Sequence, residues 1–167
     1  MRKSFFTIII LLMVGLGTSF FIGSVPIVIF ILGLLPMSFY KRGEPYQMIT
    51  SFEVGSNRFL LNKIKWQVLI FTILCVPLIA VFIVFHQDRW FIPVVEYLIF
   101  VSVHVYMILT KYAFYEPNSR SSAVQTFGTV GATGVIFPVF IPLVWLLSIR
   151  FYFKARRNLN FYLDDFN

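Results

Sequence analysis

The sequence predicts an all-α integral membrane protein with four to five transmembrane helices, and three observations support this class. The 167 residues are 59% hydrophobic and only 13% charged, whereas a soluble domain carries about 25% charged residues. Several apolar runs approach or exceed the roughly 20 residues that a helix needs to cross a membrane. The basic residues border these runs, as they do in cytoplasmic loops. We therefore expect a single transmembrane domain over residues 1–167.

The net positive charge of the chain agrees with a membrane protein. The chain has 14 Lys and Arg against 7 Asp and Glu, a net charge of +7. A nucleic-acid-binding domain would gather this charge on one face, but here most of it borders apolar runs. We expect the lipid bilayer as a partner, and no nucleic acid. The single cysteine, Cys75, lies in an apolar run and is expected to serve packing.

Residues 5–40 form one long apolar run. As a single helix it would measure about 54 Å, well beyond a hydrocarbon core of about 30 Å. The stretch Gly23-Ser24-Val25-Pro26 predicts a turn in its middle, and so an N-terminal helical hairpin. A single crossing followed by a buried or interfacial segment is the alternative. Because apolar sequence continues past the small residues of a signal-like start, we expect a retained membrane anchor.

Residues 41–65 form a polar, basic segment between apolar runs. Pro45 suits the first position of a helix, and Gly55 suits the end of one. We expect short amphipathic helices here, lying on the cytoplasmic membrane surface or on a partner protein. Lys63 and Lys65 are the candidate partner-docking residues of this segment.

Two apolar runs on either side of a polar turn at 86–90 predict a transmembrane hairpin over residues 66–112. Pro77 is expected to kink its first helix. Three aromatic residues stand where amphipathic rings favour the membrane interface. They are Trp66, Trp90 and Tyr112.

Residues 123–149 either cross the membrane once or enter it and return. Two full crossings need about 40 residues, more than this run has. Two half-helices fit, with a turn near Phe137-Pro138 or around Gly128–Gly134. One crossing places nine basic residues inside and five outside, whereas a re-entrant hairpin places thirteen inside and one outside. The positive-inside bias favours re-entry, while a single packed helix would explain the small residues.

The tail, residues 150–167, is then cytoplasmic, as is the N-terminus. Its first part is basic, and Arg156 and Arg157 are candidate partner-docking residues. Its last part interleaves aromatic and polar residues. An amphipathic helix end and a docking segment for a cytosolic protein both fit this pattern.

Glu96 and His104 are the ionisable residues that lie well inside an apolar run. They are eight residues apart, so they lie about 12 Å apart along nearly the same helical face. Ionisable residues in hydrocarbon are costly and often functional, which makes this pair the candidate intramembrane polar site. The alternatives are an interfacial carboxylate and a neutral structural histidine.

The sequence has no motif for catalysis or for cofactor binding. It lacks a phosphate-binding glycine loop followed by Lys-Ser/Thr, a His-Glu-x-x-His motif and a cysteine cluster. We therefore expect no catalytic, cofactor-binding or metal-binding residues, and we expect the chain not to be an enzyme.

The segments FEVGSNRFLLNKIKWQVLI and FYFKARRNLNFYLDDFN, with the helices between them, resemble the later half of ABC-2-type transporter permease subunits. The resemblance covers about residues 45–167 and rests on the order of elements. It implies a homodimeric or heteromeric pore driven by a separate cytosolic ATPase, with the helices at 45–65 as coupling elements. Such permeases usually have six spanning helices, and this chain is shorter.

Two functional hypotheses follow. The first is a permease-like subunit of a multi-protein transporter, an oligomer in the bacterial inner membrane with both termini cytoplasmic. It predicts a polar cavity between subunits. The second is a non-transporting scaffold or accessory subunit of a larger membrane complex. It predicts an apolar interior without a continuous polar path.

Overall fold

The chain folds into helices in the part that the computed structural model describes, residues 2–37, 44–50, 54–117 and 121–163. The all-α class is confirmed for these residues. The helices are α1 (Arg2–Gly17), α2 (Ser24–Leu34), α3 (Tyr46–Thr50), α4 (Ser56–Phe85), α5 (Phe91–Ala113), α6 (Ser122–Ile136) and α7 (Ile141–Leu163). Short 3₁₀ turns at Gln87–Arg89 and Pro138–Phe140 join α4 to α5 and α6 to α7.

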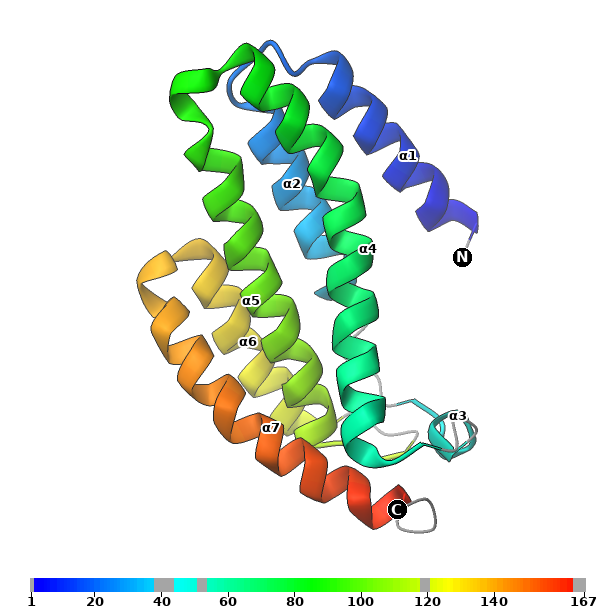
Figure 1. The fold of residues 1–167 in the computed structure, drawn as a ribbon. Coiled ribbons are helices and arrows are strands. Elements are labelled where there is room, and N and C mark those ends of the chain that lie inside the picture. Colours follow the sequence, from blue (N-terminus) through cyan, green and yellow to red (C-terminus); the bar gives the residue numbers. More distant parts are fainter. Residues whose placement is uncertain (1, 38–43, 51–53, 118–120, 164–167) are drawn as a thin grey trace.

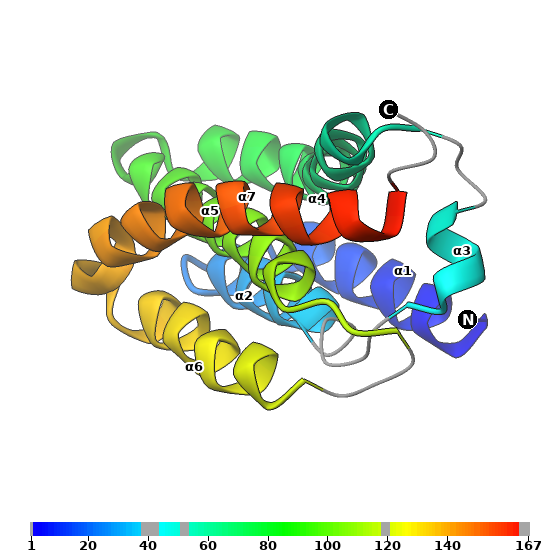
Figure 2. The same cartoon turned by 90° about the horizontal axis from the view of Figure 1, so that it is seen from below.

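Helix α5 is the centre of the bundle. Figure 2 shows it among α2, α4, α6 and α7, and it packs against each of them. Every residue from Tyr106 to Ala113 is buried as a result. One apolar cluster fills the space between α5, α7 and the start of α4, and a second fills the space between α5, α2 and the rest of α4.

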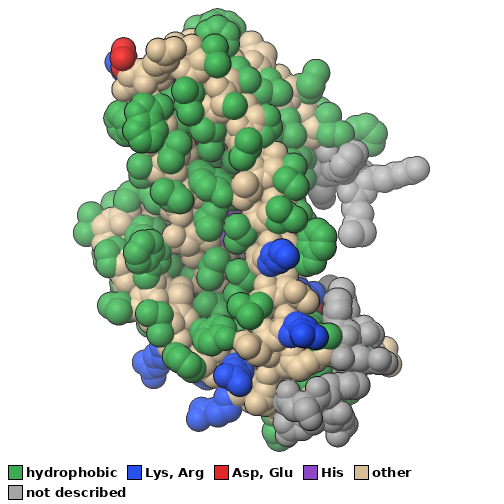
Figure 3. Space-filling model, in the orientation of Figure 1, with side chains coloured by type: hydrophobic (Ala, Val, Ile, Leu, Met, Phe, Trp, Pro, Cys, Tyr) green, Lys and Arg blue, Asp and Glu red, His purple; other side chains and the backbone are tan. Residues whose placement is uncertain are grey.

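Lysine and arginine side chains gather at one end of the bundle. In Figure 3 most of them lie over the lower half, toward the end where α4 begins and where α5 and α7 end (Figure 1), while Arg89 lies in the turn at the opposite end. The middle of the same face is mostly apolar. We call this end of the molecule the basic end. The opposite end carries the turn between α4 and α5.

Helices α1 and α2 form the N-terminal hairpin. The chain turns at residues 18–23, slightly before the predicted Gly23–Pro26 turn. The Ser24 hydroxyl lies 2.6 Å from the carbonyl oxygen of Thr18 and 2.8 Å from that of Phe21. Ser24 thus holds the turn against the start of α2. Residues 38–40, the end of the predicted second helix, lie outside the described part.

Helix α4 runs without a break from Ser56 to Phe85. The prediction of a separate surface helix before a spanning helix at Trp66 is therefore wrong for residues 56–65. Pro77 lies inside α4 and does not end it, although an interior proline removes a backbone hydrogen bond and crowds the preceding turn. The basic residues of the predicted surface helix instead occupy the first three turns of α4. In the preceding segment, α3 begins directly after Pro45, as predicted.

Three helical segments are long and apolar enough to cross a membrane, namely Ser56–Phe85, Gln87–Ala113 and Pro138–Leu163. The apolar segments Phe6–Gly17 and Ser24–Met37 are shorter. The structure therefore supports three spanning candidates in the described part of the chain. The larger number, four to five, stays a prediction.

Helices α6 and α7 form a second hairpin. Helix α6 starts at the basic end and stops at about half the height of α5, where α7 begins its return (Figure 1). The chain reverses at Phe137, which leaves the helical conformation with φ −122° and ψ 92°. Pro138 disfavours a helical residue before it. Of the two turn positions predicted, the structure has the one at Phe137-Pro138, and Gly128–Gly134 lies inside α6.

Two glycines let short helices approach α5 closely. A Cβ atom built on Gly33 of α2 would lie 2.3–2.5 Å from three ring atoms of Phe100. A Cβ atom on Gly131 of α6 would lie 2.9 Å from the nearest ring atom of Tyr106. Both distances are too short for carbon atoms, so glycine is needed at each contact.

We expect Gly33→Ala to lower the free energy of unfolding by about 1–3 kcal/mol, because the added methyl group overlaps the Phe100 ring. The measurement is the melting temperature of the purified protein in mild detergent. Gly17→Ala is the matched control, since nothing lies within 4 Å of its added Cβ. Equal melting temperatures for the two variants would contradict the close contact between α2 and α5.

Candidate functional site

His104 lies at the centre of the bundle and is fully buried. Its Nε2 atom is 2.9 Å from the carbonyl oxygen of Gly33, and its ring packs edge-on against Phe71. If Nε2 carries the proton, His104 satisfies a carbonyl at the end of α2 that has no partner within its own helix. Among the described residues, Nδ1 has no hydrogen-bond partner. These contacts fit the structural alternative given for this histidine.

Glu96 lies in the second turn of α5, half-buried and close to the buried Cys75 of α4. In the described part of the chain it makes no hydrogen bond or ion pair, and Arg89 does not pair with it. The structure gives Glu96 and His104 no shared partner. The predicted intramembrane site is therefore two separate features: a buried, bonded histidine and a carboxyl group on the side of α5.

Helix α6 has one polar face that the sequence analysis did not identify. Five of its residues recur every three or four positions and are exposed, namely Ser122, Gln125, Thr126, Thr129 and Thr133. The three threonine hydroxyls donate to carbonyl oxygens of their own helix at 2.6–3.1 Å. The opposite face contains the buried Gly131 and Gly134. We call these five residues the α6 polar face.

The spacing of these residues was the signal that could have identified the face. In the single-crossing alternative, the small residues Gly128, Thr129, Ala132 and Thr133 pack closely against a neighbouring helix. The structure instead uses Gly131 and Gly134 for the close contacts, with Tyr106 and Val144. The two threonines point away from the bundle.

The carboxylate of Glu44 organises the basic end. Lys111 of α5 approaches it at 3.0 Å and Lys63 of α4 at 3.2 Å. The Tyr112 hydroxyl lies 3.1 Å from both carboxylate oxygens. The Tyr115 hydroxyl donates to the backbone carbonyl of Glu44 at 2.7 Å. We call these five residues the Glu44 cluster.

The Glu44 cluster is largely removed from water, since the exposed fractions of the Glu44 and Lys111 side chains are 19% and 10%. Burial alone would raise the pKa of Glu44, but the Lys111 and Lys63 ammonium groups outweigh it and lower the pKa below 4.5. Burial, with the nearby Glu44 charge, raises the pKa of Tyr115 to about 12. The carboxylate therefore stays charged and the Tyr115 hydroxyl stays a donor at neutral pH.

Helix α7 is attached to the same end by polar contacts. The Asn158 amide donates to the backbone carbonyls of Tyr112 and Tyr115, each at 3.1 Å. The Tyr112 carbonyl lies in the last turn of α5 and also accepts from the Tyr115 N–H at 3.4 Å, and the Tyr115 carbonyl lies just past the helix. Asn158 therefore links α7 to the C-terminal end of α5.

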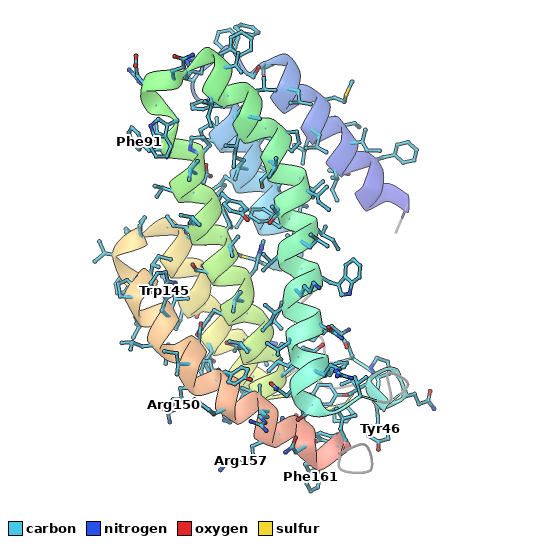
Figure 4. All side chains as sticks on the ribbon, in the orientation of Figure 1. Tyr46, Phe91, Trp145, Arg150, Arg157 and Phe161 are labelled. Carbon is cyan, nitrogen blue, oxygen red and sulfur yellow. The ribbon has the colours of Figure 1, made fainter. Side chains whose placement is uncertain are left out.

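The four candidate docking residues fall into two groups. Lys63 is bound to Glu44, so it is part of the internal cluster. Lys65, Arg156 and Arg157 are exposed, and Figure 4 shows Arg157 pointing outward from the lower part of α7.

The three predicted interfacial aromatics also differ from one another. Trp66 and Trp90 are 63% and 53% exposed, as expected for rings at a membrane interface. Tyr112 is 2% exposed and donates to Glu44. Tyr112 therefore belongs to the Glu44 cluster and packs against Phe59 and Tyr115, and its place at the membrane interface stays a prediction.

No grouping of three His, Cys, Asp or Glu that could hold a metal ion occurs in the described ranges. Comparisons with protein-family models, curated proteins and solved structures give no match. Function must therefore be argued from the geometry of this chain.

We expect Glu44→Gln to lower the free energy of unfolding at pH 7 by about 1–3 kcal/mol, because two lysines lose their counter-charge. The stabilisation should be fully present above pH 4.5 and should disappear as the pH falls through the lower pKa of the folded state. Melting temperatures of both proteins in detergent across this range measure it. Asp88→Asn, in the exposed turn, is the control. A Glu44→Gln deficit that is the same at every pH would contradict a charge-based role.

Proposed function

We propose that this chain is a membrane-embedded, permease-like subunit of a multi-protein transporter, in which the α6 polar face lines a pathway completed by another subunit. The observation that carries the proposal is the presence of this face on a helix that stops at half the height of the bundle. Irregular or half-depth segments at membrane depth are found where protein or a wet cavity surrounds them. Such segments commonly line substrate sites in transporters.

The orientation that we propose places the basic end in the cytoplasm. Helix α4 begins there, and α5 and α7 end there (Figure 1). The concentration of lysine and arginine at that end agrees with the positive-inside bias. In this orientation α4 and α5 cross the membrane, while α6 and α7 form a re-entrant hairpin. The N-terminal hairpin, residues 5–40, supplies up to two further crossings.

Helix lengths support a re-entrant hairpin. Helix α6 has 15 residues and so measures about 22 Å, less than a hydrocarbon core of about 30 Å. Helix α7 is longer, but basic residues begin at Arg150. Its apolar first part, 141–149, measures only about 13 Å. These lengths let the two helices reach about the middle of the membrane and return, but they are too short for each helix to cross it fully.

The hydrogen bonds of the α6 polar face allow it to lie at membrane depth. Each threonine hydroxyl donates within its own helix, so the three hydroxyl donors of this face are satisfied even in an apolar medium. The oxygen of each hydroxyl can still accept a further hydrogen bond. A row of such oxygens can contact water, a polar substrate or a neighbouring helix.

The scaffold hypothesis is favoured by a different observation. In the described part of the chain, two apolar clusters fill the interior, as a non-transporting subunit would have. A pathway therefore has to lie between subunits, on the outer side of α6. If the α6 polar face instead packs dryly against another protein, the chain is a scaffold or accessory subunit.

The energy source that we propose is a separate cytosolic ATPase that docks at the basic end of a subunit in the bacterial inner membrane. Lys65, Arg156 and Arg157 are the exposed candidates for this contact. Lys63 is less suitable, because it is held by Glu44.

Water access to the α6 polar face separates the two functions. In a Cys75→Ala background, we expect Thr129→Cys to react with a charged thiol reagent, because water reaches this face. The membranes are native and permeabilised, so that the reagent has access from both sides. Val139→Cys at the hairpin turn and Leu146→Cys on α7 are controls, since both side chains are exposed apolar groups that should face lipid. The extent of modification is read by mass spectrometry.

Two results would count against the transporter proposal. An unreactive Thr129→Cys would mean a dry face, as expected of a scaffold. Equal reaction at all three positions would mean that the hairpin lies in water outside the membrane.

A further inference from the structure

A pocket of about 370 Å³ lies at the basic end, where the start of α4 meets the last turns of α7. It is lined by Gly55, Ser56, Asn57, Arg58, Arg156 and Asn160. All six residues are polar or glycine, in a chain that is 59% hydrophobic. The pocket is separate from the α6 polar face and from the Glu44 cluster.

Two arginines from different helices line this pocket. Arg58 lies in the first turn of α4, and Arg156 lies on α7 one turn before Asn160. Neither guanidinium makes an ion pair with a residue that the structure describes, and both are exposed. The Glu44 carboxylate is already shared by two lysines. Among the described residues, the two arginines therefore have no counter-charge, and their guanidinium groups are suited to bidentate binding of an oxyanion.

The backbone adds donors to the same pocket. Helix α4 starts after Gly55, which provides no side-chain cap. The first backbone hydrogen bond of the helix runs from the Phe59 N–H to the Gly55 carbonyl at 3.0 Å. The N–H groups of Ser56, Asn57 and Arg58 have no acceptor within the helix. Together with the helix dipole, they favour an anion beside the two guanidinium groups.

Side-chain contacts fix the walls of the pocket. Ser56, which is 2% exposed, donates its hydroxyl to the Asn160 amide oxygen across the two helices. The Tyr152 hydroxyl donates to the Asn57 amide oxygen at 2.5 Å. These bonds join α4 to α7, so the arginines are carried by helices that are held in register.

We propose that this pocket binds a phosphate group, carried either by a phospholipid headgroup or by a soluble phosphate. Two guanidinium groups and three backbone N–H groups match the several oxygens of one phosphate. The site's place at the basic end gives it access to both sources. The inference does not depend on the proposed transport function.

The test uses the full chain, purified in mild detergent, and four probes. These are dioctanoyl phosphatidic acid, dioctanoyl phosphatidylcholine, inorganic phosphate, and dioctanoylglycerol, which lacks a phosphate. Binding is measured by titration calorimetry. We expect phosphatidic acid or inorganic phosphate to bind, and dioctanoylglycerol not to bind. Tighter binding of phosphatidic acid than of inorganic phosphate would identify a lipid as the source, and the reverse order a soluble phosphate.

Two matched double variants separate the pocket from general surface charge. Arg58→Gln with Arg156→Gln removes both pocket arginines. Arg150→Gln with Arg157→Gln removes the same charge from α7 at positions outside the pocket, both of which point outward in Figure 4. We expect the first variant to weaken binding about tenfold or more, and the second to change it less than threefold. Unchanged melting temperatures without probe verify that both variants fold.

Two outcomes would overturn the proposal. One is an equal loss of affinity in the two double variants, which would show that the overall charge of the basic end, and not the pocket, attracts the phosphate. The other is equal binding of phosphatidic acid and dioctanoylglycerol together with no binding of inorganic phosphate, which would show recognition of acyl chains.

Discussion

The structure depends on one half-buried carboxylate, that of Glu44. Lys111 is 8% exposed, and a lysine so deeply placed needs a counter-charge because burying an unpaired charge is costly. Glu44 provides it, and at the same time binds Lys63 of α4 and Tyr112 of α5. This arrangement fixes the basic ends of α4 and α5 relative to each other. Without it, the described part of the chain would leave two lysines close together with no acid between them.

The end of α5 then determines where the second hairpin lies. Asn158 of α7 binds the carbonyls of Tyr112 and Tyr115, and the Tyr106 hydroxyl binds the carbonyl of Phe127 in α6 at 2.9 Å. The glycine at position 131 allows α6 to lie directly on Tyr106. The same contacts that hold the hairpin on α5 leave the α6 polar face pointing outward. The pocket with the two arginines forms where α7 returns to the start of α4.

Local signals predicted the helices but not the tertiary contacts. Runs of apolar residues, Pro45 and Pro138 act over a few residues, so the helical class and the turn at Phe137-Pro138 could be predicted. Glu44 could not be recognised, because its partners Lys63 and Lys111 are brought to it only by the packing of α4 and α5. Glu96 and His104 illustrate the reverse case. Helical spacing places them on nearly one face, but among the described residues His104 has a hydrogen-bond partner and Glu96 has none.

The central claim is that α6 and α7 enter the membrane from the basic end and return to it. The most direct measurement is the sidedness of single cysteines in a Cys75→Ala background, probed with an impermeant maleimide on intact cells and on inverted membranes. We predict that Gln87→Cys reacts from outside, whereas Ser122→Cys and Phe161→Cys react only from the cytoplasmic side. Reaction of Phe161→Cys from outside, with Ser122→Cys remaining cytoplasmic, would show a single crossing and contradict the account.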